Sequence, residues 1–160
     1  MTRYGESINI LQEALAILGD EAGYEPAVAL SLLSLGAVYN RKEQYAEALS
    51  HLESAREMSR KDSDPKQEGL ALFQIGLSRK GLGQIEAANE CFALAMVLFG
   101  QIGDEYNVAL VLVERGQVNV AHGSKELGTA EIMQALDMME KYEDGRARYE
   151  AGKIRELIGS

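Results

Sequence analysis

The feature that most constrains the fold of this chain is a series of three equally spaced glycines. Gly36, Gly76 and Gly116 follow one another with the same 40-residue step. Each follows an apolar stretch with helical spacing. A glycine inside a helix costs about 1 kcal/mol relative to alanine. A chain that carries this cost three times at a fixed step needs a small residue there for packing.

Other positions keep the same step. Ala48 and Ala88 recur as Gly128, and three further columns contain alanines or larger apolar residues. These columns are Leu52, Phe92 and Ile132; Ala55, Ala95 and Ala135; and Met58, Leu98 and Met138. Self-similarity at a period between about 20 and 50 residues indicates a solenoid of stacked repeats.

Each repeat is predicted to form two helices joined by a polar turn. In the first repeat the helical spacing of the apolar residues is interrupted at Asn40–Gln44. We expect small residues to meet where the two helices of a repeat cross. The expected pairs are Gly36 with Ala48, Gly76 with Ala88, and Gly116 with Gly128.

An aspartate column marks the helix starts. Asp64, Asp104 and Asp144 share the step of the glycines. Asp64 is followed by Pro65, and Gln67 comes three residues after the aspartate, which is the pattern of an N-cap with a capping-box partner. Asp104 repeats the cap without the proline. Helices are therefore predicted to begin directly after these aspartates.

The repeat resembles a known family. The pattern Leu32-x-x-Leu35-Gly36-x-x-Tyr39, followed by Tyr45, Ala48, Leu52 and Ala55, is similar to the tetratricopeptide repeat (TPR). The usual TPR period is about 34 residues. The longer, 40-residue step of this chain resembles the long-helix subclass found in bacterial regulators of the maltose-activator type and in eukaryotic polarity adaptors.

The resemblance implies an all-α fold, a right-handed α-solenoid of antiparallel helix hairpins with about eight helices. We expect a single domain over residues 1–160, in which three full repeats lie between terminal half-units. The predicted segments are a half-repeat at 6–20, repeats at 25–62, 65–102 and 105–142, and a C-terminal helix at 145–158. Two interpretations of the ends stay open, a piece of a longer protein or a small protein with natural end caps.

Composition narrows the choice of partners and compartment. The net charge of −9 argues against binding to a phosphate backbone, which requires clustered Lys and Arg. One cysteine excludes an intrachain disulfide framework and favours a reducing compartment, so we expect a cytoplasmic location. The most apolar stretch, Cys91–Phe99, is too short to span a bilayer and is predicted to be a helix buried on all sides.

Sequence patterns typical of catalysis are weak. His51 and His122 lie in different repeats and columns, and no cysteine or second histidine has metal-ligand spacing. Gly81-Leu82-Gly83 is a helix–helix turn rather than a phosphate loop, because no strand precedes it. Cys91 is interpreted as a packed thiol beside the core position Phe92. We therefore expect no enzyme activity, no metal site and no cofactor.

The TPR resemblance implies a binding face. In that family the first helix of each repeat lines the concave side, at four positions fixed relative to the conserved glycine. The corresponding residues, called the inner row below, are Leu30, Leu33, Ala37, Asn40, Leu70, Phe73, Leu77, Lys80, Leu110, Val113, Gln117 and Val120. Most are apolar, which excludes the Lys and Asn clamp that holds a peptide carboxylate and the asparagine ladder of the polarity adaptors.

An apolar inner row suits an amphipathic helix laid in a groove. The other interpretation is that these residues pack against one another or against a second copy of the chain. The function predicted from the sequence is thus a protein–protein interaction module, a TPR scaffold that binds a peptide or a partner helix. The alternative is a ligand-sensing or dimerisation domain of a larger bacterial transcriptional or signalling regulator. The expected partner is a protein or peptide, including a second copy, with no nucleic acid or membrane contact.

Overall fold

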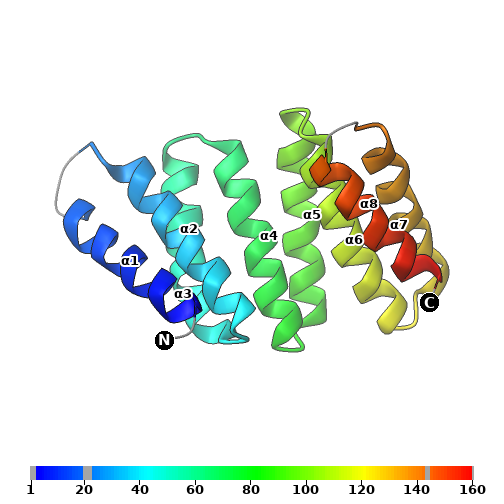
Figure 1. Ribbon diagram of the computed structural model, residues 1–160, viewed down its shortest axis with the longest axis horizontal. Helices are drawn as coiled ribbons and strands as arrows, with labels where there is room; N and C mark the ends of the chain where they lie inside the picture. Colours follow the sequence, from blue (N-terminus) through cyan, green and yellow to red (C-terminus); the bar gives the residue numbers. More distant parts are fainter. Residues whose placement is uncertain (1–2, 20–22, 143–144, 160) are drawn as a thin grey trace. The chain divides into compact units, whose positions relative to one another are not determined.

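The structure, a computed structural model, describes residues 3–19, 23–142 and 145–159. Every regular element in these ranges is an α-helix, which confirms the all-α prediction. The helices are α1 (Arg3–Leu18), α2 (Glu25–Arg41), α3 (Tyr45–Lys61), α4 (Pro65–Gly81), α5 (Ile85–Gln101), α6 (Glu105–Ala121), α7 (Lys125–Glu140) and α8 (Gly145–Gly159) (Figure 1). Asp20, Asp144 and Ser160, which belong to the predicted segments or columns, lie outside the described residues.

The chain divides into two compact units, Met1–Leu94 and Ala95–Ser160, and α5 runs across the division. In the first unit α1 packs against α2, α2 and α3 form a hairpin, and α4 packs against both α3 and α2. In the second unit α6 and α7 form a hairpin, and α8 packs against α7. That the two units form a single domain stays a prediction.

The glycine column lies where helices approach most closely. A methyl group added at Gly36 would overlap the Leu52 side chain, and one added at Gly116 would lie 2.7 Å from the Gly128 carbonyl oxygen. At Gly76 the three nearest atoms all belong to the Phe92 ring, the closest at 2.5 Å, so this ring rather than Ala88 requires the glycine. The prediction of a packing role for the three glycines is confirmed.

The aspartate caps form, but without the predicted capping box. Asp64 Oδ1 accepts a hydrogen bond from the Gln67 backbone N–H at 3.0 Å, and Asp104 Oδ1 accepts one from the Asn107 N–H at 3.1 Å. In a capping box the Gln67 side chain would also accept from the Asp64 N–H. That N–H instead donates to the Ser59 carbonyl, and Gln67 Oε1 is buried without a hydrogen-bond partner. The end of α3 therefore uses the Asp64 N–H that a capping box would require.

The apolar stretch of α5 is buried on one side only, so the prediction of burial on all sides is wrong. Phe92 and Phe99 are fully buried, whereas Leu94 and Val97 are 49% and 56% exposed. The equivalent positions of α3, Ser54 and Glu57, are exposed as well. A second helix of a hairpin therefore keeps an exposed side even where its residues are apolar.

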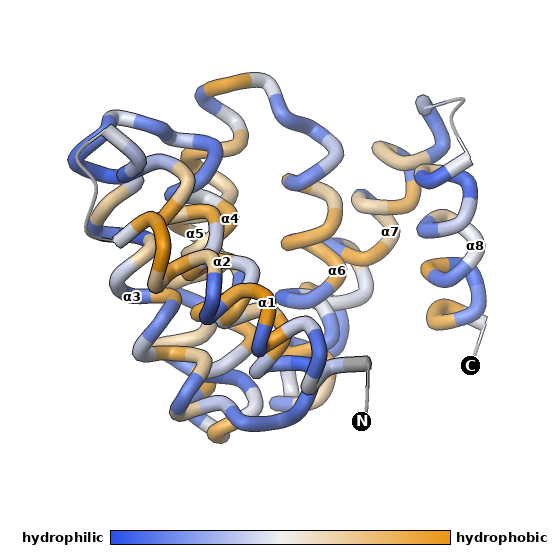
Figure 2. The backbone as a smooth tube through the Cα atoms, turned by 60° about the vertical axis from the view of Figure 1, so that its left-hand side comes forward, coloured by the Kyte–Doolittle hydropathy of each residue, from blue (hydrophilic) through white to orange (hydrophobic). Residues whose placement is uncertain are grey.

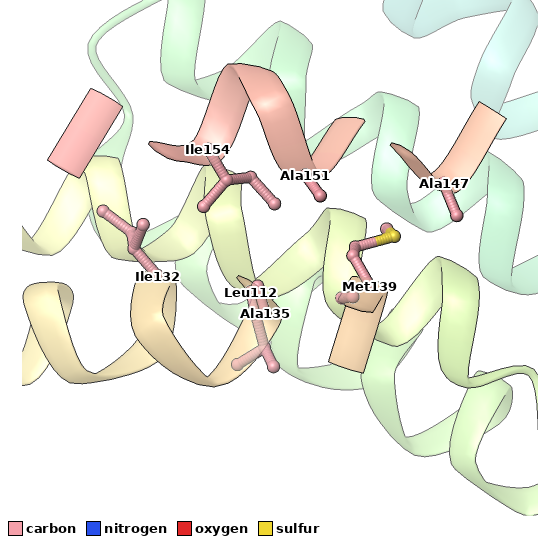
Figure 3. Packing of buried hydrophobic residues seen from close by; sticks show 8 residues of the cluster. Leu112, Ile132, Ala135, Met139, Ala147, Ala151 and Ile154 are labelled. Carbon is pink, nitrogen blue, oxygen red and sulfur yellow. The ribbon is translucent and has the colours of Figure 1, made fainter. Parts of the chain in front are cut away.

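The core of the second unit joins all of its complete helices. Leu112 of α6, Ile132 and Met139 of α7, and Ala147 and Ile154 of α8 are buried in one cluster (Figure 3). Small alanines on α8 let it approach α7 closely, and Figure 2 shows hydrophilic and hydrophobic stretches along this helix. The core is thus placed between α8 and the α6–α7 hairpin.

The first hairpin contains an aromatic stack in which one ring belongs to a titratable histidine. The His51 ring of α3 stacks on the Tyr39 ring of α2, with centroids 5.4 Å apart and planes 13° apart, and Lys42 lies 5.8 Å from the centroid of the same tyrosine ring. Burial lowers the pKa of His51 below its ordinary value of 6.5. The native hairpin therefore favours the neutral imidazole.

This shift predicts acid destabilisation. Because the folded chain binds the His51 proton less readily than the unfolded chain, the contribution of the neutral ring is complete above about pH 6.5 and is lost as the pH falls below that value. Replacing His51 with Phe keeps the stack and removes the titration. Urea denaturation between about pH 7.5 and about pH 5 should show a smaller loss of stability for His51→Phe than for the natural chain. Equal losses would contradict the assignment.

Candidate partner-binding face

The inner row of the first unit lies on α2 and α4, two helices that pack side by side. Leu30 is 50% exposed, and Ala37, Leu70 and Leu77 are partly exposed, so all four offer apolar surface. Leu33 is only 8% exposed and belongs to the core of the unit. The structure thus brings most of the predicted apolar residues of this unit to accessible positions on neighbouring helices.

Asn40 is engaged within the fold. Its Nδ2 donates to the main-chain oxygen of Gln74 at 2.9 Å and to Gln74 Oε1 at 3.1 Å. Its Oδ1 accepts a hydrogen bond from Ser78 Oγ at 2.6 Å. Both ends of the amide are therefore satisfied by α4, and Asn40 joins α2 to α4 rather than being free to bind the backbone of a partner.

The Phe73 ring packs against a second ring, that of Phe92. Its centroid lies 6.0 Å from that of Phe92, and the two planes are inclined by 50°. Phe92 is fully buried, whereas Phe73 is partly exposed. Such tilted pairs are favourable for aromatic rings. The accessible part of Phe73 is thus a rigid apolar contact.

The second unit carries its own part of the inner row on α6. Leu110, Val113 and Gln117 are partly exposed, and Val120 is 37% exposed. Leu110 and Val113 also pack against the core cluster of this unit. These residues combine a supporting role in the core with a limited apolar surface.

Three residues of α8 occupy positions that correspond to the inner row of α6. Glu150, Lys153 and Leu157 lie one repeat period after Leu110, Val113 and Gln117. Lys153 Nζ donates to Glu150 Oε2 at 3.0 Å, and this hydrogen bond raises the pKa of the lysine. Adding the period to the α6 positions would have found these residues. Two of these three α8 positions are therefore charged, whereas Leu110 and Val113 of α6 are apolar.

Large apolar side chains are also exposed away from the inner row. Ile10 and Ile17 of α1, Leu94 and Val97 of α5, and Leu127 and Met133 of α7 are between 49% and 69% exposed. They come from α1 and from the second helices of hairpins, and Leu94 and Val97 belong to the stretch that the sequence predicted to be buried on all sides. They provide matched controls for any test of the inner row.

Features suited to chemistry are sparse in the described ranges. Within them, no three His, Cys, Asp or Glu residues gather closely enough to hold a metal ion. Burial raises the pKa of the Cys91 thiol, which disfavours the reactive thiolate. A hollow on α3 is lined by Glu53, Arg56, Glu57 and Arg60, whose charges are compensated by ion pairs with one another and with α4.

The described helices were compared with the length and apolar character of a membrane span. None of the helices in residues 3–19, 23–142 and 145–159 has the length and apolar character needed to cross a bilayer.

The repeat geometry is shared with known proteins. A family model described as tetratricopeptide repeat matches residues 1–61, while the comparison with curated protein sequences gives no match. The structure of aspartyl phosphate phosphatase F from Bacillus subtilis aligns with a TM-score of 0.83 at 20% identity, covering 98% of this chain and 41% of that one. BtubC from P. vanneervenii aligns at 0.78 and 16% identity, covering 98% and 66%.

A third solved structure with a similar fold is itself described as a TPR domain. The TPR domain of Arabidopsis FLU aligns with a TM-score of 0.69 at 15% identity, covering 74% of this chain and 99% of that domain. At these identities the likeness concerns the fold. Together with the match over residues 1–61, it supports a TPR family and an α-solenoid of helix hairpins, as predicted. The maltose-activator subclass stays a prediction.

The match of residues 1–61 to the tetratricopeptide-repeat model suggests a scaffold for protein–protein interaction. The present chain spans less than half the length of phosphatase F, so the activity of that whole protein is no guide to this one.

Proposed function

We propose that this chain is a protein-binding scaffold in which the inner-row residues of α2 and α4 accept the apolar face of a partner helix. The observation that carries the proposal is the accessible apolar surface on α2 and α4, where Leu30 is half exposed beside the partly exposed Leu70, Phe73 and Leu77. These side chains sit on packed helices, and the Phe73 ring is fixed by Phe92. A rigid apolar surface binds with little loss of side-chain entropy.

The chemistry of the row favours an apolar segment over a charged one. Of the eight inner-row residues in the first unit, Asn40 has its amide satisfied by α4, and Lys80 is the only charged residue. The remaining six are Leu, Ala or Phe. An amphipathic helix presents apolar residues at three- and four-residue intervals, which matches a row of this kind.

Leu30→Glu tests this proposal at a half-exposed position that should not disturb folding. The probe is a fluorescent, uncharged amphipathic helix of Leu, Ala and Gln with about 18 residues, or five turns. We expect Leu30→Glu to weaken binding by about tenfold or more in fluorescence anisotropy, because a carboxylate would face the apolar side of the peptide.

Leu94→Glu is the matched control, since Leu94 is 49% exposed in the same unit but lies on a second helix. It should leave the affinity within about twofold of the natural chain. Circular dichroism verifies that both variants keep their helices. Loss of binding in Leu94→Glu with normal binding in Leu30→Glu would place the site on the second helices and overturn the proposal.

A further inference from the structure

The three repeats differ at one set of positions where first and second helices meet. Positions 35, 75 and 115 form one column, 39, 79 and 119 a second, and 51, 91 and 131 a third. In the first repeat the set is Leu35, Tyr39 and His51; in the second it is Ile75, Arg79 and Cys91; in the third it is Arg115, Asn119 and Glu131. The residues change from apolar and aromatic to charged along the chain, while the small residues at the crossings are retained.

In the third repeat this set forms a buried ion pair. Arg115 Nη2 lies 2.6 Å from Glu131 Oε1, and Asn119 Nδ2 donates to Glu131 Oε2 at 2.8 Å. Glu131 is only 6% exposed, so its carboxylate depends on these two α6 residues for compensation. Removing one partner of a buried pair is strongly destabilising, because a charge is left without its counterpart in the interior.

The same hairpin has an unusually close backbone crossing. A methyl group added at Gly128 would overlap the carbonyl oxygen of Gly116 and lie 2.7 Å from the backbone nitrogen of Val120. The corresponding residues of α3 and α5 are Ala48 and Ala88. Neither of those helices would therefore fit against α6 at the distance that α7 adopts.

We infer that Glu131 and Gly128 specify α7 as the partner of α6 and disfavour the exchange of α7 with α3. If α7 lay against α2, Glu131 would face the uncharged side chains of Leu35 and Tyr39 in place of Arg115 and Asn119. If α3 lay against α6, Arg115 would face His51 without a carboxylate, and the Ala48 methyl would meet the backbone of Gly116. Similar repeats within one chain are prone to mispairing, and unpaired charges disfavour the wrong pairs.

Charge reversal tests this inference with the whole chain. Arg115→Glu places two carboxylates at the crossing, and Glu131→Arg places two guanidinium groups there. Each single variant should lose about 100-fold or more in its folding equilibrium constant, and the double variant R115E/E131R should recover most of the loss. Denaturation in urea, followed by circular dichroism, measures the three constants.

The equimolar mixture of the two single variants gives the sharper result. The α7 helix of one chain, with α8 attached, then finds its complementary α6 in the other chain, so co-refolding should yield a one-to-one heterodimer by light scattering. The control is Glu140→Arg, which breaks an exposed Arg155–Glu140 pair of the same 2.6 Å length and should change neither stability nor association. Two monomers in the mixture, or a double variant no more stable than the sum of its single changes, would overturn the inference.

Discussion

Replacing Phe92 with alanine is expected to lower the free energy of unfolding by about 3–5 kcal/mol. The ring is fully buried and occupies the space beside Gly76, where its nearest atom would lie 2.5 Å from an added methyl group. It also supports the Phe73 ring, so the loss leaves a cavity and removes an aromatic contact. Urea denaturation followed by circular dichroism measures the change.

Two further variants make this prediction specific. Leu94→Ala, two residues along the same helix and 49% exposed, should cost no more than about 0.5 kcal/mol. In the Phe92→Ala background, Gly76→Ala should be much less harmful than in the natural chain, since its methyl group enters the vacated space. Equal effects of Phe92→Ala and Leu94→Ala, or strict additivity with Gly76→Ala, would show that the ring does not fill this crossing.

The second large effect is expected at Gly116. Alanine there would place its methyl group 2.7 Å from the carbonyl oxygen of Gly128 and 2.6 Å from the Ile132 side chain. The side chain can turn aside, whereas the carbonyl belongs to the backbone of α7, so the two helices must separate. Gly116→Ala should therefore destabilise the chain by about 1–3 kcal/mol despite the better helix propensity of alanine.

Gly100→Ala in α5, a helix of the same length as α6, should have the opposite effect on stability. Nothing lies within 4 Å of a methyl group added at Gly100 in α5. This change should raise stability by about 0.5–1 kcal/mol through helix propensity alone. If thermal denaturation showed Gly116→Ala to be as well tolerated as Gly100→Ala, the close crossing of α6 and α7 would be disproved.

Periodicity predicted much of the fold. The constant repeat period located the hairpins because every repeat places glycine where two helices meet. The proline and the aspartate caps located the helix starts, since Asp64 and Asp104 accept backbone N–H groups as expected. The caps are local signals and the glycines recur at a fixed step, so both can be recognised in one sequence without an alignment.

Other features depend on contacts that a pattern does not reveal. The role of Asn40 follows from its distances to Gln74 and Ser78, which belong to the next first helix. Arg115 and Glu131 form an ion pair at positions where the other repeats carry different residues. In the sequence these two residues therefore look only like departures from the repeat pattern. The exposed side of α5 was missed because hydropathy does not distinguish a helix within a core from one at a surface.

The proposed binding site for a partner helix consists of the inner-row residues on the first helices α2 and α4. Its most direct test is photo-crosslinking with benzoylphenylalanine placed at position 30 or at position 94 in otherwise natural chains, using the amphipathic helical probe. Both positions are about half exposed and lie in the same unit. We expect a saturable crosslink from position 30 that unlabelled peptide competes away, with little from position 94. Competable crosslinking from position 94 alone would contradict it.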